Sequence, residues 1–63
     1  MSNNGPRYQA REGSQTGHSC CFDASVIDTS LPANYEVERM LCECGTIEEA
    51  RKIADALNAR AMA

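Results

Sequence analysis

The chain contains four cysteines and one histidine, the residue types best suited to binding a metal ion or acting as a nucleophile. Cys20 and Cys21 are adjacent, and His18 lies two positions before them. Cys42 and Cys44 follow later, with one residue between them. Thiolates and imidazoles are ligands that zinc prefers, with Zn–S distances of about 2.3 Å. If two strands bring both cysteine pairs to the same end of a sheet, His18, Cys20, Cys42 and Cys44 could surround a zinc ion.

The spacing of the cysteines nevertheless favours buried thiols over a zinc site. Neither pair has the two-residue separation of the common structural zinc motifs. Adjacent residues of a strand also point to opposite faces, so Cys20 and Cys21 could not both join one site without a bulge. Free cysteine is among the most often buried residue types. We therefore expect Cys20, Cys42 and Cys44 to be small core residues and no cofactor to be bound, with the zinc site as the alternative.

A cysteine nucleophile activated by histidine is the enzymatic hypothesis. It requires His18 within hydrogen-bond reach of a thiolate, together with an oxyanion donor and a cleft. A chain of 63 residues can hardly wall such a pocket. We therefore predict that the protein is not an enzyme.

The element that would position these residues most firmly is an amphipathic helix over residues 46–58. Thr46 followed by Glu49 is the capping-box pair, in which each residue satisfies a free backbone N–H at the start of the helix. Asn58 is of a type that often follows a helix end. Apolar residues recur at spacings of three and four, which predicts one buried stripe. The stripe consists of Ile47, Ala50, Ile53, Ala54 and Leu57.

Two strands are predicted before the helix, at residues 20–29 and 35–44, joined by a proline-containing loop. Alternation with a period of two places one set of side chains towards the helix and another set away from it. The inward set is Phe22, Ala24, Val26, Met40, Cys42 and Cys44. The apolar members of the outward set are Ile27, Val37 and Leu41.

The domain organisation follows from these elements. Residues 1–19 are rich in Ser, Asn, Gly, Gln and Thr, which predicts a mostly disordered tail, although residues 7–11 could form a short edge strand. Residues 20–60 are predicted to form a ββα or βββα domain. The expected fold class is α+β, a small antiparallel sheet of two or three strands packed by one C-terminal helix.

Composition limits the classes of partner. The net charge of −3 argues against a nucleic-acid-binding protein, whose usual mark is a basic patch. The sequence has no apolar run long enough for a membrane span or a signal peptide, so we expect the cytoplasm, where thiols stay reduced. So short a chain builds only a small core, and we expect it to be supported by a partner or a second copy.

Two runs of the sequence, CFDASVIDT and LCECGTIEEARKIADALN, resemble very short proteins of bacteriophages and prophages. In those proteins a hairpin that ends in a Val/Ile-Asp-Thr step leads to a C-E-C strand and an A-x-x-I-A-x-A-L-N helix. The resemblance covers residues 20–58 and implies a hairpin-plus-helix fold, with no functional residues attached to it. Small acidic phage proteins of this size include anti-CRISPR proteins, which occupy a surface of a host nuclease or surveillance complex.

These observations together predict a phage-type protein–protein interaction module in the bacterial host cytoplasm, most simply a steric inhibitor of a host defence complex such as a CRISPR effector. The partner is expected to meet exposed charged side chains. These are Glu36, Glu38, Arg39, Glu43, Glu48, Arg51, Lys52 and Asp55. The outward apolar residues predict in addition a homodimer, or docking of the same face on the target.

Overall fold

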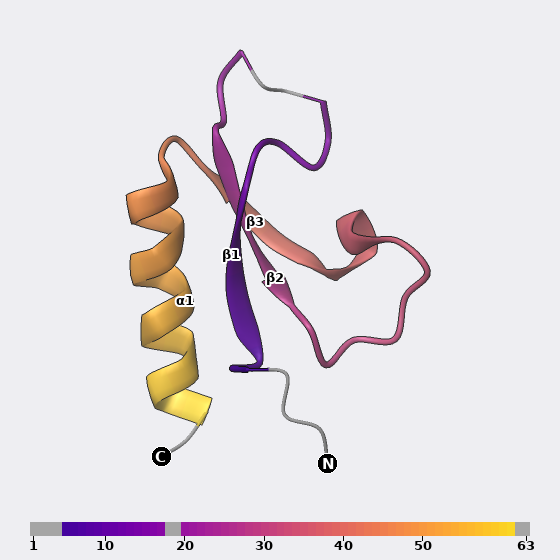
Figure 1. Ribbon diagram of the computed structural model, residues 1–63, viewed down its shortest axis with the longest axis vertical. Coiled ribbons are helices and arrows are strands. Elements are labelled where there is room, and N and C mark those ends of the chain that lie inside the picture. The colour runs from indigo at the N-terminus through magenta and orange to yellow at the C-terminus, as the bar shows by residue number, and fades with distance from the viewer. Residues whose placement is uncertain (1–4, 18–19, 62–63) are drawn as a thin grey trace.

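The computed structural model describes residues 5–17 and 20–61. Within these ranges three antiparallel strands form a sheet in the order β1-β2-β3: β1 (Tyr8–Glu12), β2 (Ala24–Asp28) and β3 (Met40–Cys44). A short 3₁₀ helix, η1 (Glu36–Arg39), precedes β3, and α1 (Ile47–Ala61) follows it. The predicted α+β fold is therefore confirmed, with three strands in the sheet and one C-terminal helix packed on it (Figure 1).

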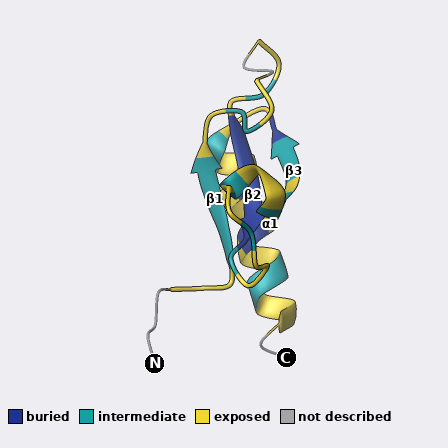
Figure 2. Ribbon diagram, turned by 90° about the vertical axis from the view of Figure 1, so that its right-hand side faces the viewer, coloured by how far each residue is buried: buried dark blue, intermediate teal, exposed yellow. Residues whose placement is uncertain are grey.

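The central strand β2 is enclosed on every side. β1 and β3 pair with its two edges, α1 covers one face of the sheet, and η1 lies against the other face (Figure 1). All five residues of β2 are consequently buried, while most of β1 and β3 is half-buried (Figure 2). The second cover over the sheet was not foreseen, because the prediction left that face open.

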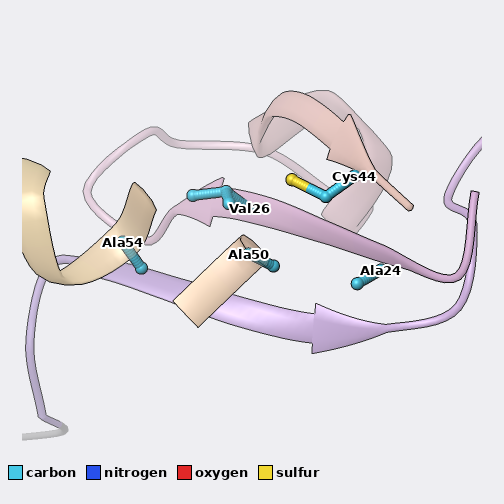
Figure 3. Close-up of a cluster of buried hydrophobic side chains, with 5 residues drawn as sticks. All are labelled: Ala24, Val26, Cys44, Ala50 and Ala54. Carbon is cyan, nitrogen blue, oxygen red and sulfur yellow. The ribbon is translucent and has the colours of Figure 1, made fainter. Parts of the chain in front are cut away.

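The core between α1 and the sheet is built mainly from small side chains. Its buried members are Ala24, Val26, Cys44, Ala50 and Ala54, which gather between the helix and the strands (Figure 3). Ile47 and Leu57 pack partly against them, as the helical stripe predicted. Ile53 does not, because it lies on the flank of α1 towards β3 and is 38% exposed. Alanines at the centre of the contact let the helix approach the sheet closely, and they leave a larger side chain at the flank uncovered.

The predicted cap starts α1, with one shift. The Glu49 N–H donates to Thr46 Oγ1 over 3.2 Å, as expected. The Glu49 carboxylate accepts from the N–H of Gly45 over 3.2 Å, one residue earlier than the N–H we predicted. The helix also continues past residue 58 to Ala61, because two alanines and an arginine, all strong helix formers, follow Asn58.

The folded domain begins well before residue 20, so the predicted domain boundary was placed too late. β1 pairs with β2 from Tyr8 opposite Asp28 to Glu12 opposite Ala24, which realises the three-strand alternative. Tyr8 and Ala10 both pack against the core from β1. The apolar alternation of Tyr8 and Ala10 in a polar segment predicted an edge strand only as an alternative, because β1 owes its stability to pairing with β2.

The two predicted strands are shorter than expected. β2 begins only at Ala24, and Cys20 and Cys21 lie in an exposed turn before it. Phe22, predicted to point inward, is half-buried. The first part of the predicted 35–44 strand is η1, where the Glu38 N–H donates to the Tyr35 carbonyl over 3.0 Å. The two glutamates of this segment are of a type that is depleted in strands, which disfavours a buried strand here.

An irregularity in the β2–β3 register changes which side chains share a face. Val26 lies opposite Cys42, but Ile27 lies opposite Met40, so Leu41 is the extra residue of a bulge. Met40 is therefore shifted away from the helix-facing row in which we placed it. Ile27, predicted to be exposed, is fully buried because η1 covers that face.

Candidate partner-binding surfaces

The outer edge of β1 is the first surface with binding capacity. In an antiparallel ladder, alternate residues turn their N–H and C=O groups towards the neighbouring strand and away from it. The Thr29 N–H donates to the Arg7 carbonyl over 2.8 Å, so the residues in step with Arg7 face β2. Tyr8, Ala10 and Glu12 therefore present their backbone groups to the outer edge.

A helix side chain already occupies one of these edge positions. The Tyr8 N–H donates to Asn58 Oδ1 over 2.9 Å, and Asn58 Nδ2 donates to the Tyr8 carbonyl over 2.8 Å. These are the two hydrogen bonds that a residue of a further strand would make with Tyr8. Asn58 was predicted as a residue beyond the helix end, which is wrong, because it lies within α1 with its amide on the edge strand. No local pattern indicates this contact, since its partners are 50 positions apart in the chain.

An open groove with a volume of about 420 Å³ runs between this edge and α1. We call it the edge groove. It is lined by Pro6, Tyr8, Gln9, Ala10, Arg11, Arg51, Ala54, Asp55 and Asn58. Arg51 and Asp55 belong to the predicted contact residues, whereas the small residues Ala10 and Ala54 were not expected at a binding site. Their methyl groups leave room beside the edge of β1.

The charged residues of α1 remain available for a partner. Glu48, Arg51, Lys52 and Asp55 are all exposed. Their spacing of three, four and seven places them on one side of the helix. Within the described part of the chain, none of these side chains makes a hydrogen bond or an ion pair. This half of the predicted contact set keeps its full capacity to bind.

The other half of the set holds the protein itself together. Glu43 accepts hydrogen bonds from the Ser14 hydroxyl (2.6 Å), the Gln15 N–H (3.0 Å) and the Thr16 hydroxyl (2.9 Å). These bonds, that from Ser14 above all, hold the pKa of Glu43 below its ordinary value. Glu43 therefore fastens the segment after β1 to β3, and a partner would meet it only through this cluster.

The remaining three predicted contacts brace the connection between β2 and β3. Arg11 Nε donates to Glu36 Oε2 over 2.9 Å, which ties β1 to η1. Arg39 Nε donates to the Leu31 carbonyl over 2.8 Å, and Glu38 accepts a backbone N–H of the same loop over 3.2 Å. The charged groups of Glu36, Glu38 and Arg39 thus already have hydrogen-bond partners within the protein, which the sequence could not show.

A second surface is apolar. Among the described residues, five large hydrophobic side chains are exposed, and four of them belong to the connection and the start of β3. We refer to these four exposed residues, Leu31, Tyr35, Val37 and Leu41, as the connection surface. Val37 and Leu41 are exposed as predicted, by 41% and 47%. The fifth, Ile53, lies on α1.

The two cysteine pairs do not come together. Cys44 is buried in the core and Cys42 is half-buried beside it, which agrees with the prediction for this pair. Burial, and then the neighbouring Cys42 thiol, raise the pKa of Cys44. Cys20 is exposed, so its predicted core position is wrong, because β2 begins four residues later.

The zinc alternative finds no support in this arrangement. In residues 5–17 and 20–61, no three His, Cys, Asp or Glu side chains lie close enough to hold a metal ion. His18, the fourth predicted ligand, falls outside the described residues. Cys20 and Cys21 do lie side by side, with their sulfur atoms 3.3 Å apart.

No α-helix in the described part of the chain has the length and apolar character needed to cross a membrane. Comparison with known proteins finds no matching family model, no matching curated protein and no matching solved structure.

Proposed function

We propose that this chain is a protein–protein interaction module that acts by occupying a surface of its partner, with no chemistry of its own. The observation that supports this proposal is the edge groove. One wall is a strand edge on which the Ala10 N–H has no partner in the described structure. The other wall carries Arg51 and Asp55, whose charges are likewise unpaired there. Open strand edges are completed by another polypeptide segment, which makes a protein the natural occupant.

The partner we propose is a nuclease or surveillance complex of a bacterial defence system, met in the cytoplasm of the host. The resemblance of residues 20–58 to short phage proteins supports this narrower proposal. Arg51 and Asp55 place charges of both signs along the groove, which suits a polypeptide better than a polyanion such as DNA. The net charge of −3 is also unfavourable for binding nucleic acid directly.

The test is inhibition of purified CRISPR effector nucleases by the purified protein. We expect DNA cleavage by one effector type to fall as the protein is added, and Arg51→Glu to weaken the effect. Arg60→Glu is the matched control, because Arg60 is exposed on the same helix but does not line the groove. If no effector is inhibited and none co-purifies with the protein, the proposed partner class is wrong.

The connection surface supports a second candidate function, self-association. Leu31, Tyr35, Val37 and Leu41 would lose exposed apolar area if two copies met there around a two-fold axis. Sedimentation equilibrium of the reduced protein should then show a dimer that Leu41→Glu dissociates. A monomer at high micromolar concentration, unchanged by the substitution, would exclude the homodimer and leave this surface for the target.

A further inference from the structure

We propose that the edge groove binds an extended segment of the partner as a fourth strand, antiparallel to β1, which carries an acidic residue and, two positions later, a basic residue. This inference rests on the proposed function, because it describes how such a module would hold its protein partner. It goes further in naming the conformation and the side chains of the segment.

The amide of Asn58 marks where the added strand would run. It makes with Tyr8 the pair of hydrogen bonds that a strand residue would make, at 2.9 and 2.8 Å. The next outward positions along β1 are Ala10 and Glu12, spaced by two residues on the same edge. A segment that lies beside Ala10 and Glu12, with one end at Asn58, would continue this line of hydrogen bonds.

Side-chain size allows a backbone to reach this edge. Ala10 and Ala54 face the groove from the strand and from the helix, and each carries only a methyl group. Bulkier residues at these two positions would fill the space next to the edge. The groove therefore leaves space beside the Ala10 N–H, while the Ala10 carbonyl accepts a hydrogen bond from Arg11 Nη1 over 3.3 Å, which an added strand would replace.

The charges on the helix wall match the repeat of a strand. Arg51 and Asp55 are four residues apart, which is about 6 Å along a helix axis. Side chains on one face of a strand recur every two residues, about 6.6 Å. Two successive helix-facing residues of the added strand would therefore meet Arg51 and Asp55 in turn.

The direction of the segment follows from the direction of α1. Asn58, near the end of α1, lies at Tyr8, whereas Ile47, at its start, lies near Glu12 (Figure 1). α1 thus runs opposite to β1, and a strand antiparallel to β1 runs the same way as α1. Such a strand meets Arg51 first and Asp55 second, which requires the order acidic, any residue, basic. Antiparallel pairing is also slightly more stable than parallel pairing.

A second copy of the protein fits this edge poorly. α1 packs more extensively against β1 than against β2 or β3, so it stands close to the edge. Paired strands lie about 4.8 Å apart, whereas helix axes need about 8–10 Å. Two copies joined through β1 would crowd their helices together on one face of the sheet, so a segment without its own helix is the better occupant.

The experiment uses two capped peptides of the same composition, with glutamate and lysine separated by one residue in a background of threonine and valine. One has glutamate first and the other has lysine first. Fluorescence anisotropy with the full chain should show tighter binding of the glutamate-first peptide, by roughly tenfold for two exposed charge pairs. Amide shifts in ¹⁵N spectra should centre on Ala10 and Glu12. The double variant Arg51→Asp/Asp55→Arg should reverse the preference, and Arg60→Glu should leave it unchanged.

The proposal is overturned if both peptides bind equally, if neither binds at millimolar concentration, or if the shifted amides lie elsewhere. It is equally overturned if Ala10 and Glu12 become protected through dimerisation of the free protein. The spectrum of the double variant reports whether it remains folded. If effector inhibition persists in the folded double variant, the module still works as proposed but through another surface, so the two failures are distinguishable.

Discussion

Arg7 and Asp28 form a two-pronged ion pair across the end of β1 and β2. Arg7 Nε lies 2.9 Å from Asp28 Oδ1, and Arg7 Nη2 lies 3.0 Å from Oδ2. The Asp28 side chain is buried, whereas that of Arg7 is about half exposed. The Ser30 hydroxyl and N–H also donate to Asp28 Oδ1, over 2.7 and 3.0 Å. One carboxylate thus joins β1, β2 and the following turn.

These contacts predict an acid-sensitive stability. The hydrogen bond from Arg7, and then those from Ser30, hold the pKa of Asp28 far below its ordinary value. A lowered folded-state pKa stabilises the protein above the unfolded-state pKa, about 3.9, and the stabilisation is lost as the pH falls from there towards the folded value. We expect Asp28→Asn to cost roughly 1–2 kcal/mol at pH 7, since solvent screens the exposed Arg7.

Denaturant unfolding between pH 2 and pH 7 measures this effect. The loss of stability below pH 4 should be smaller in Asp28→Asn than in the parent chain. Asp23→Asn is the control, because Asp23 is exposed and makes no side-chain hydrogen bond with the described residues. Equal acid profiles for the parent and Asp28→Asn would show that the ion pair does not stabilise the fold.

The Asn58–Tyr8 contact should contribute measurably to stability. Asn58→Ala removes both hydrogen bonds from the edge of β1, and we expect a loss of about 1–2 kcal/mol. The higher helix propensity of alanine would return a few tenths of this. Asn58→Asp keeps the acceptor for the Tyr8 N–H but places a carboxylate against the Tyr8 carbonyl, so it should cost at least as much at neutral pH. Arg60→Ala, two residues further along α1, is the control and should change the free energy of unfolding by less than about 0.5 kcal/mol. If Asn58→Ala has an equally small effect, the contact does not stabilise the fold.

Replacing a small residue at the helix–sheet contact by a larger one should destabilise the protein. Ala50 is fully buried against the sheet, so Ala50→Leu must push α1 away or displace its neighbours. We expect a loss of about 1–3 kcal/mol in the free energy of unfolding. Ala56→Leu is the matched control on the exposed side of the same helix. Thermal unfolding followed by circular dichroism should separate the two variants, and equal melting temperatures would place Ala50 outside the core.

Ser25 is expected to be replaceable with a gain in stability. Its hydroxyl is fully buried in β2 and has no hydrogen-bond partner among the described residues. A buried unpaired polar group costs free energy, so Ser25→Ala should raise stability by about 1 kcal/mol. Ser30→Ala should do the opposite, because the Ser30 hydroxyl donates to Asp28. If Ser25→Ala lowers the denaturation midpoint, the Ser25 hydroxyl has a partner in solution.

Local patterns in the sequence determined the helix and the centre of the sheet. The Thr46–Glu49 cap acts within one turn, and the Ala50 and Ala54 spacing is a property of a single helix, so both can be read without knowledge of the fold. The alternation of Ala24 and Val26 likewise placed these two residues against the helix. The overall class, a small sheet with one C-terminal helix, followed from these elements.

Tertiary structure decided what lies outside such local patterns. β1 became a strand because β2 offered it a pairing edge, and Ile27 became buried because η1 folded over it. The burial of Ile27 has no signature in its own segment, and residues 7–11 predicted an edge strand only as an alternative to a disordered tail. A bulge in β3 moved Met40 out of the helix-facing row. Alternation within one strand could not predict this, since register also depends on the partner strand.

The charged residues of the candidate site show the same difference between what the local sequence determines and what the tertiary structure determines. The sequence by itself predicted eight charged side chains as contacts, and it determined that those at positions 48, 51, 52 and 55 would share one side of a helix. Only the folded chain decided that Glu36 would pair with Arg11, 25 positions away, and that Glu43 would hold Ser14, 29 positions away. It also brought Asn58 to Tyr8 and so opened the groove beside Arg51 and Asp55. A side chain's type and spacing depend on its own segment, whereas its partners depend on how distant segments are brought together by the burial of a shared core.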